Sequence, residues 1–551
     1  MLFGKGIPLR FVLENIILFL SHKPADILLM KEKTMQKFLL EFFLSSLAGI
    51  LLTLPFPKLG FTQVAWIGFI PLFAALECAS PRKAFFLGWI TGIIHFSTLL
   101  SWVTTSMTHY GNLSEGTSFF LLLLLSFYLG LYVGAFGGLL NFFRHRYCIE
   151  PAVIAPVVWT LLEFLRTYLL SGFPWGLLGY SQYQNLFLIQ IADITGVYGV
   201  SFLIVLVNVS LYLILKWAWF RINAFPFVYT IVTLGIVLSV IFYGHFRIEK
   251  IKKANKNSIH LQVSLIQGNI NQAQKWDPSY ITETFAIYQS LTVRAAKDHS
   301  DLIVWPETAV PCYFLPEHEY GPFLFNLAKT VNAPILFGSL AYQAGLQPGD
   351  YKYFNSAFLI SPKDEKVSHY DKVHLVPFGE YVPLKHFLPF VEKLVEGIGD
   401  FSPGKNLTLF SIPRARCGVL ICYEIIFPSL SRHYCKSGAN FLVTITNDAW
   451  FGRSNAPYQH FSMAVFRAVE NRTAVVRAAN SGISGIIEPT GYIQNQTPLF
   501  EQTFCNGEIP LSSFPTFYDR YGDVGVGLCG IILLLFMLIG LIINKKIDNY
   551  I

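Results

Sequence analysis

Three segments of the chain each bring a reactive side chain close to the end of an apolar, strand-like run. The run Leu302–Trp305 leads to Glu307, and the run Val419–Ile421 ends at Cys422. Lys372 lies between them in the sequence. Strand ends are rigid platforms beside open loops, so these positions suit a catalytic site.

A thiol, a carboxylate and an ammonium are the groups that acyl transfer through a thioester needs. A free thiol is mostly protonated at neutral pH and requires a base, so we expect Glu307 to accept the proton of Cys422. Burial or the nearby Glu380 would raise the pKa of Glu307 toward neutrality, as a general base requires. Lys372, with a backbone N–H near Tyr423, would then stabilise the oxyanion of a tetrahedral intermediate.

Each of these residues also has an ordinary structural interpretation. A free cysteine such as Cys422 is commonly a buried small hydrophobe, and Glu307 suits a turn or a helix cap. Lys372 beside Asp371 resembles a solvated surface pair. His374 is interpreted as a core or hydrogen-bonding histidine. Taken singly, none of these residues decides the function.

The composition excludes an ordinary soluble enzyme. Of 551 residues, 53% are hydrophobic and only 14% are charged, against roughly a quarter charged in a typical soluble domain. The net charge is +7, but the basic residues form short clusters between apolar runs, which is typical of membrane topology and not of nucleic-acid binding. The eight cysteines form no C-x-x-C pair and no zinc-like spacing, so we expect no metal and no cofactor.

Eight apolar segments approach or reach the length needed to cross about 30 Å of hydrocarbon. The second and fifth fit this pattern least well. The segments are Phe38–Leu54, Phe61–Leu76, Ala84–Val103, Ser118–Phe142, Ala152–Leu170, Val197–Leu215, Phe225–Tyr243 and Val524–Ile543. Glu163 and Arg166 lie inside the fifth segment, should face protein or water, and are interpreted as a mutual structural pair.

Lysine and arginine are concentrated in alternate loops, which predicts the orientation. The N-terminal stretch and the loops containing Arg82, Arg144, Lys216 and Lys545 are basic, whereas residues 104–117 and 171–196 contain no lysine or arginine. Basic loops resist translocation, so the basic ends should be cytoplasmic and the insert after the seventh segment should lie outside the cytoplasm.

The insert has a different character from the spans. Its short apolar runs alternate with helical periods, which favours an α/β layered domain. The expected strands are Leu261–Ile266, Leu302–Trp305, Ile335–Phe337, Ala357–Ile360, Gly418–Ile421, Phe441–Thr446, Ala474–Arg477 and Gly485–Ile487. One helix should follow Asp277 and another should cover about Tyr458–Glu470.

The segments around Glu307, Lys372 and Cys422 resemble the nitrilase (carbon–nitrogen hydrolase) superfamily, whose Glu-Lys-Cys triad occurs in this order. With spans on both sides, the chain from about Met35 is similar to the membrane-embedded branch, the apolipoprotein N-acyltransferase family. Further matching stretches are Gly172–Trp175, Gln267–Ile270, Lys275–Asp277, His374–Val382, Asn447–Gly452 and Gln459–Phe461.

The resemblance implies an α/β nitrilase-like α-β-β-α sandwich inserted before the last helix of an eight-helix transmembrane bundle. The expected parts are a cytoplasmic extension (1–36), a seven-helix region (37–243), an extracytoplasmic catalytic domain (244–521), a final transmembrane helix (522–544) and a cytoplasmic tail (545–551). The resemblance makes Glu307 the base, Lys372 the oxyanion-stabilising lysine and Cys422 the acylated nucleophile. It gives site-support or substrate-contact roles to Trp276, Glu380, Tyr423 and Glu424. For Trp276, an aromatic wall against an acyl chain and plain core packing both stay open.

The activity implied by the resemblance is N-acylation of apolipoproteins at the outer face of the bacterial inner membrane. The partners would be a phospholipid acyl donor, a diacylglyceryl-modified apolipoprotein acceptor and the bilayer, with no nucleic acid. Apolar residues suggest a lipid-facing gate in His386–Val395 and Tyr313–Phe325. One alternative is a membrane-tethered nitrilase-type amidase, in which water deacylates the thioester. Another is a non-enzymatic receptor with a degenerate ectodomain.

Overall fold

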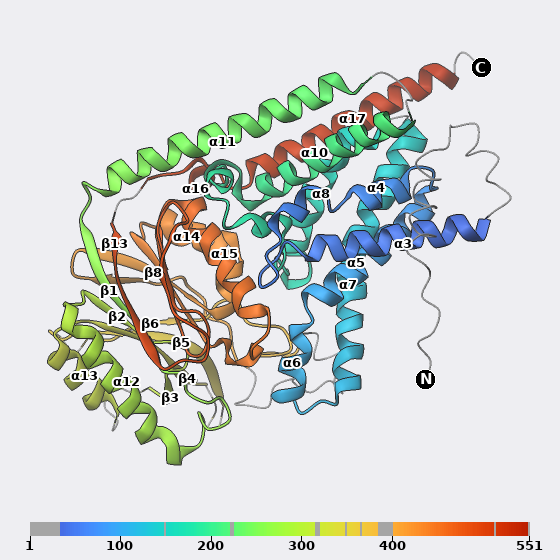
Figure 1. Ribbon diagram of the computed structural model, residues 1–551. Coiled ribbons are helices and arrows are strands. Elements are labelled where there is room, and N and C mark those ends of the chain that lie inside the picture. The colour runs from blue at the N-terminus through green and yellow to red at the C-terminus, as the bar shows by residue number, and fades with distance from the viewer. Residues whose placement is uncertain are drawn as a thin grey trace.

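The computed structural model describes residues 34–147, 150–220, 225–314, 320–345, 347, 350–363, 366–383, 401–511 and 514–548. Figure 1 shows a helical bundle on the right and a layered α/β domain on the left. Nearly all of the expected extension 1–36, and the expected gate segment His386–Val395, lie outside the described residues. The second gate segment, Tyr313–Phe325, is described only at its two ends.

The bundle is built mainly from long apolar helices. They are α3 (Thr34–Thr53), η2 (Thr62–Trp66), α4 (Ile70–Leu76), α5 (Pro81–Leu99), α6 (Trp102–His109), α7 (Glu115–Tyr147), α8 (Pro151–Tyr168), η3 (Leu169–Ser171), η4 (Leu178–Gln182), α9 (Leu186–Ile189), α10 (Ala192–Phe220), α11 (Phe227–Asn255) and α17 (Val524–Asp548). Within the described residues, six helices are long and apolar enough to cross a membrane. A seventh span results if α5 and α6, bent by 53°, are counted together. The expected second span is a shorter apolar segment, Thr62–Leu76.

Small residues let α5 and α7 pack closely. A Cβ added to Gly88 would lie 2.4 Å from the Val133 carbonyl oxygen, and one added to Gly92 would lie 2.6 Å from Gly130 Cα. Backbones that approach this closely gain van der Waals contact, which is how helices associate in lipid.

The α/β domain contains two packed sheets. The first has the order β13-β1-β2-β4-β5-β6 with β3 on β4, and the second has the order β12-β11-β10-β9-β8-β7. Their strands are β1 (His260–Gln267), β2 (Leu302–Val304), β3 (Val310–Tyr313), β4 (Ile335–Ala344), β5 (Tyr351–Ile360), β6 (Ser368–Asp371), β7 (Leu409–Ile412), β8 (Ala415–Ile421), β9 (Phe441–Thr446), β10 (Ala474–Ala479), β11 (Gly485–Ile487), β12 (Ile493–Gln496) and β13 (Thr503–Pro510). The helical elements of the domain are η5 (Pro278–Tyr280), α12 (Ile281–Ala295), η6 (Ala296–Asp298), α13 (Tyr320–Val331), η7 (Cys422–Ile426), α14 (Pro428–Lys436), η8 (Asp448–Phe451), α15 (Ala456–Asn471) and α16 (Phe517–Tyr521).

Two apolar clusters define the layers of this domain. Val263 and Val304 of the first sheet share a buried cluster with Val419 and Val443 of the second. The other face of the first sheet is covered by α12 and α13, through residues such as Tyr288. Helices α14 and α15 cover the second sheet, which completes the expected α-β-β-α order.

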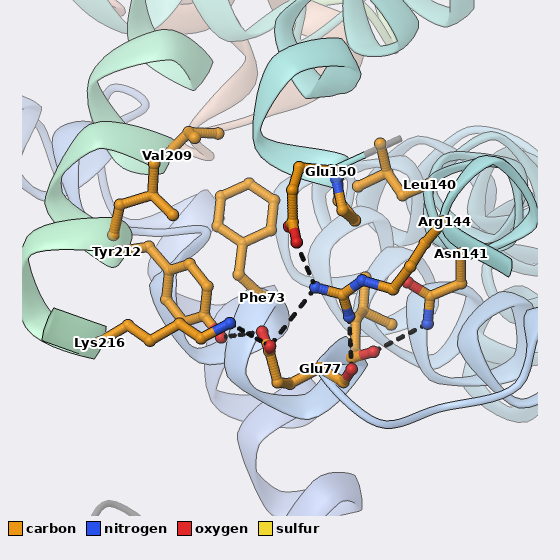
Figure 2. A pocket seen from close by; sticks show the side chains of 12 residues that line it. Phe73, Glu77, Leu140, Asn141, Arg144, Glu150, Val209, Tyr212 and Lys216 are labelled. Carbon is orange, nitrogen blue, oxygen red and sulfur yellow. Dashed lines mark hydrogen bonds and ion pairs between the residues drawn. The ribbon is translucent and has the colours of Figure 1, made fainter. Parts of the chain in front are cut away.

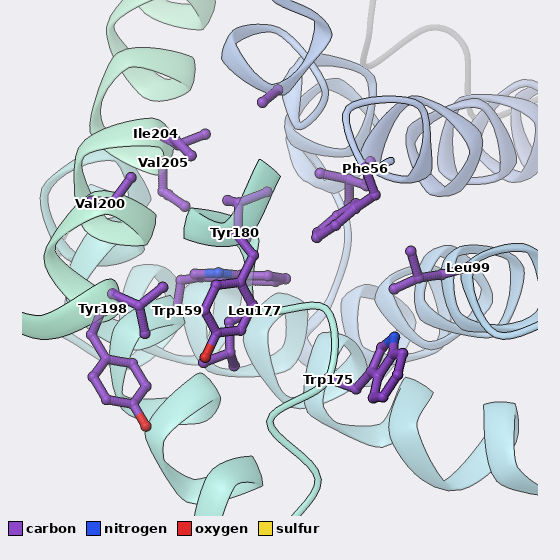
Figure 3. Packing of buried hydrophobic residues seen from close by; sticks show 14 of the residues in the cluster. Phe56, Leu99, Trp159, Trp175, Leu177, Tyr180, Tyr198, Val200, Ile204 and Val205 are labelled. Atoms are coloured by element: carbon purple, nitrogen blue, oxygen red, sulfur yellow. The ribbon is translucent and has the colours of Figure 1, made fainter. Parts of the chain in front are cut away.

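The second helix layer also packs against the bundle. One buried cluster joins Trp159, Trp175 and Tyr180 of the bundle to Phe466 of α15 and Val475 of β10. Figure 3 shows Trp159, Trp175 and Tyr180 in this cluster. The bundle and the α/β domain therefore share one apolar core.

The two charged side chains expected to form a pair, Glu163 and Arg166, also make hydrogen bonds to the backbone. Arg166 donates to the carbonyl oxygens of Phe173 at 2.9 Å and Trp175 at 2.7 Å, and Glu163 accepts from the Leu178 N–H at 2.7 Å. Both side chains therefore shape the segment that follows α8 and η3, a role that the interpretation as a mutual pair did not include.

An ion network joins the end of α4 to the ends of α7 and α10, as Figure 2 shows from close by. Glu77, just after α4, pairs with Lys216 of α10 and with Arg144 of α7, and accepts from the Tyr212 hydroxyl at 2.6 Å. The opposite end of α10 carries Asp193, which lies near the α/β domain. Two of the basic loops thus meet at one end of the bundle, in agreement with the charge pattern.

Candidate active site

Glu307 lies in the turn after β2, and hydrogen bonds hold both of its carboxylate oxygens. Oε1 accepts from Asn355 Nδ2 at 2.7 Å and lies 3.8 Å from Lys372 Nζ. Oε2 accepts from the Asn447 backbone N–H at 2.8 Å. The side chain is buried, so this carboxylate has a fixed direction.

Lys372 follows β6 and is almost completely buried. Its Nζ donates to Glu380 Oε1 at 2.9 Å, and Glu380 Oε2 accepts from the Val376 N–H at 2.8 Å. Burial by itself lowers the pKa of Lys372, but the carboxylates of Glu380 and Glu307 outweigh it and raise the pKa above its ordinary value. Lys372 therefore stays charged, which suits an oxyanion stabiliser and not a base.

Cys422 directly follows β8 as the first residue of η7, with a φ of 53°. The left-handed region is costly for a residue that carries a Cβ, and such strain is concentrated at functional sites. Burial and the Glu307 carboxylate raise the pKa of the thiol, while Lys372 lowers it. Both partners thus act on the thiol electrostatically, and the resting group is a thiol whose proton must leave as it attacks.

Glu424, two residues after Cys422, is fully buried and tied to two different elements. Its Oε2 accepts from the Ile421 N–H at 2.7 Å, while Oε1 accepts from the Tyr370 hydroxyl at 2.7 Å and the Val373 N–H at 2.8 Å. Burial raises the pKa of this carboxyl to about 7, although the bond from Ile421 and the charge of Lys372 lower it. Glu424 therefore fastens the loop that carries Lys372 to the strand end that carries Cys422.

Tyr423 and His374 pack together beside the site. The ring centroids of His374 and Phe427 are 3.9 Å apart, and Tyr423 also contacts Phe427 edge-on. Burial and the charge of Lys372 lower the pKa of His374 to about 4, as expected for a neutral core histidine. The Tyr423 hydroxyl lies 3.4 Å from the Gly172 carbonyl oxygen of the bundle, which links the site to the apolar helices.

Trp276 is the predicted site residue that stands apart from the buried cluster. Its side chain is 40% exposed, which excludes the core-packing alternative. The neighbouring Lys275 Nζ lies 6.0 Å from the centre of its ring and donates to the Glu307 carbonyl oxygen at 3.2 Å. Trp276 therefore has an exposed aromatic ring, and the residue before it, Lys275, contacts Glu307.

Two residues that contact the site were not predicted as members of it. Asn355 donates from one Nδ2 to Glu307 Oε1 at 2.7 Å and to Glu380 Oε1 at 2.9 Å. In the sequence, the indication for Asn355 was an amide side chain next to an apolar, strand-like run. Lys275 is buried, and burial lowers its pKa to about 7 although Glu307 raises it. In the sequence, the indication for Lys275 was its position directly before the predicted site residue Trp276.

Residues 48–210 match the sequence profile described as the apolipoprotein N-acyltransferase N-terminal domain, and residues 262–516 match that of carbon-nitrogen hydrolase. The apolipoprotein N-acyltransferase of Geobacter metallireducens is 47% identical over 492 residues, covering 89% of this chain and 93% of that protein. The one of Haemophilus influenzae is 32% identical, covering 96% and 99%.

Similar solved structures include a CN-hydrolase superfamily protein of Xanthomonas campestris, at 18% identity and a TM-score of 0.35, which covers 46% of this chain and 91% of that one. A nitrilase-superfamily amidase of Nesterenkonia has 17% identity and a TM-score of 0.36, covering 49% and 98%. Because the full-length relatives exceed 30% identity over nearly the whole chain, this chain belongs to the apolipoprotein N-acyltransferase family.

Proposed function

We propose that this protein transfers a fatty acyl chain from a phospholipid, through a thioester on Cys422, to the α-amine of the diacylglyceryl-cysteine that begins an apolipoprotein. The observation that carries the proposal is a strained cysteine acted on by both a buried carboxylate and a buried ammonium. The names of the relatives support the choice of substrates.

In the first half-reaction, Glu307 takes the proton of Cys422 as Sγ attacks the ester carbonyl carbon of the phospholipid. The oxyanion that forms is stabilised by the charged Nζ of Lys372. The carbon–oxygen ester bond then breaks, and Glu307 returns the proton to the departing glycerol oxygen. A lysophospholipid leaves, and the acyl group remains on Cys422.

In the second half-reaction, the neutral α-amine of the acceptor attacks the thioester carbonyl carbon. Glu307 takes a proton from the attacking nitrogen, and Lys372 again faces the oxyanion. The carbon–sulfur bond breaks, and the Cys422 sulfur recovers its proton from Glu307. The products are an amide and the free enzyme, so no cofactor takes part in either step.

The proposed setting is an eight-span protein of the bacterial inner membrane with its catalytic domain (244–521) on the extracytoplasmic face. The six to seven long apolar helices support the multi-pass arrangement. The basic residues Arg144 and Lys216 meet at the end of the bundle away from this domain, and basic loops favour the cytoplasm. The shared apolar core supports an active site held at the bilayer surface, where water that would hydrolyse the thioester is scarce.

Intact-protein mass spectrometry tests the proposal. Protein purified in detergent is mixed with phospholipid and analysed for a fatty acyl adduct on Cys422, and a diacylglyceryl-cysteine peptide is then added. We expect the adduct to form and to pass to the peptide amine, and Cys422→Ala to show neither event. Peptide acylation by Cys422→Ala would contradict the proposal. Release of the acyl group only as free fatty acid would favour the amidase-like alternative.

A further inference from the structure

A connected series of three buried polar side chains leads to the backbone of Cys422. It consists of His460 in α15, Asp448 at the start of η8 and Arg477 in β10, all buried. Asp448 Oδ2 accepts from Arg477 Nη2 at 2.7 Å. His460 Nε2 lies 3.1 Å from the Cys422 carbonyl oxygen. The series therefore ends at the backbone carbonyl of the proposed nucleophile.

The contacts of His460 determine which ring nitrogen carries the hydrogen. A carbonyl oxygen only accepts, so Nε2 must be the donor to Cys422. Nδ1 faces both Asp448 Oδ1, at 3.1 Å, and Arg477 Nη2, at 3.0 Å. Burial and the charge of Arg477 lower the pKa of His460, while the Asp448 carboxylate raises it. Arg477 and Asp448 thus hold the ring from its Nδ1 side, with Nε2 directed at the Cys422 carbonyl.

The position of this hydrogen bond matters because Cys422 is strained. Glu424 holds the Ile421 N–H before the nucleophile, and His460 holds the carbonyl after it. A φ of 53° persists in a residue with a Cβ only where its surroundings fix it. The two anchors together set the direction of Sγ.

The same loop also reaches the base and the bundle. Asn447, directly before Asp448, donates its N–H to Glu307 Oε2. The indole of Trp175, from the bundle, stacks on the His460 ring at a centroid distance of 5.5 Å and 28° between planes. The elements that orient His460 therefore also hold the carboxylate that must meet Sγ.

We infer that His460, oriented by Asp448 and Arg477, is a positioning residue that keeps Cys422 in its left-handed conformation with Sγ directed between Glu307 and Lys372. This inference rests on the proposed thioester chemistry. His460 itself exchanges no proton with substrate. A displacement of Sγ by about 1 Å is enough to cost about 100-fold in rate.

Two substitutions separate the hydrogen bond from the packing of the ring. His460→Phe keeps a ring beside Trp175 but removes the donor to the Cys422 carbonyl, whereas His460→Gln loses the ring but places an amide N–H near the position of Nε2. We expect His460→Phe to slow acylation of Cys422 by about 10- to 100-fold with an unchanged KM for phospholipid. His460→Gln should stay within a few-fold of wild type. His433→Ala, in the exposed part of α14, is the matched control.

The measurements are the rate of thioester formation, followed by mass spectrometry, and the rate of Cys422 alkylation by iodoacetamide at fixed pH. Alkylation reports the placement of Sγ without any lipid, and it should slow in His460→Phe and recover in His460→Gln. Equal rates in His460→Phe and wild type overturn the inference, and so does equal impairment of the two variants. Failure of the proposed function would look different, because wild-type Cys422 would then carry no acyl group at all.

Discussion

Replacement of Glu424 by glutamine tests whether one buried carboxylate aligns Lys372 with Cys422. At pH 8, above its pKa of about 7, Glu424 is ionised and accepts from the Tyr370 hydroxyl and the N–H groups of Ile421, Val373 and His374. Three of these four donors converge on Oε1. Glutamine has only one side-chain oxygen. If that oxygen accepts the three bonds made to Oε1, the amide nitrogen faces the Ile421 N–H, which then has no acceptor.

The magnitude follows from that single lost acceptor. A buried N–H left without a partner costs about 1–3 kcal/mol, which lowers the population of the aligned site by about 5- to 140-fold at 1.4 kcal/mol per tenfold. We expect the rate of Cys422 acylation to fall by this factor. The melting temperature should change little, because the neutral amide avoids the desolvation cost of the buried carboxylate.

The assay is time-resolved mass spectrometry of the Cys422 thioester in phospholipid–detergent micelles at pH 8. Glu508→Gln is the matched control, since Glu508 lies on β13 with a half-exposed side chain. An acylation rate within about twofold of wild type, in a protein with a normal melting temperature, would refute the alignment argument. A raised KM with a normal maximal rate would instead assign Glu424 to substrate contact.

Three further predictions concern the surroundings of the site. Trp276→Ala should leave stability within about 0.5 kcal/mol of wild type, because the side chain is 40% exposed, but it should raise the KM for phospholipid in the thioester assay. Arg166→Lys should lower stability by about 1–3 kcal/mol in detergent thermal unfolding, because one ammonium cannot replace a guanidinium that donates from Nη1 to the carbonyl oxygens of Phe173 and Trp175 and from Nη2 to that of Gly176. The pKa of His374 is lowered to about 4 from 6.5 by burial and Lys372, so its contribution to stability is present above about pH 6.5 and lost as the pH falls through about 4. The loss of melting temperature between pH 7 and pH 4 should therefore be smaller in His374→Gln than in wild type.

Much of the α/β domain could be predicted from short-range patterns. The apolar runs near Leu261, Leu302, Gly418, Phe441 and Ala474 became β1, β2, β8, β9 and β10. These strands are buried on both faces, so they appear as nearly continuous apolar runs that need no partner to be recognised. Glu307 and Cys422 follow two such strands, β2 and β8, so their positions could be recognised from the sequence, whereas Lys372 follows the short strand β6.

Other elements depend on contacts that the sequence does not display. Strands β6, β7 and β12 are short, and their pairing with a neighbouring strand defines them. Helix α11 continues to Asn255, past the expected end at Tyr243, because a helix extends beyond the lipid when its last turns are polar. Asn355 was missed since its role is to join two carboxylates from distant segments, Glu307 and Glu380.

The boundary between bundle and catalytic domain is where the sequence interpretation was weakest and where the structure adds most. Arg166 of α8 holds the carbonyl of Trp175, whose indole covers His460, which in turn holds the carbonyl of Cys422. A buried arginine in an apolar helix is expensive in lipid, and here it supports a loop that reaches the nucleophile. The membrane helices are therefore part of the architecture that we infer to orient the thiol, and in the proposed reaction they also bring it to its lipid substrate.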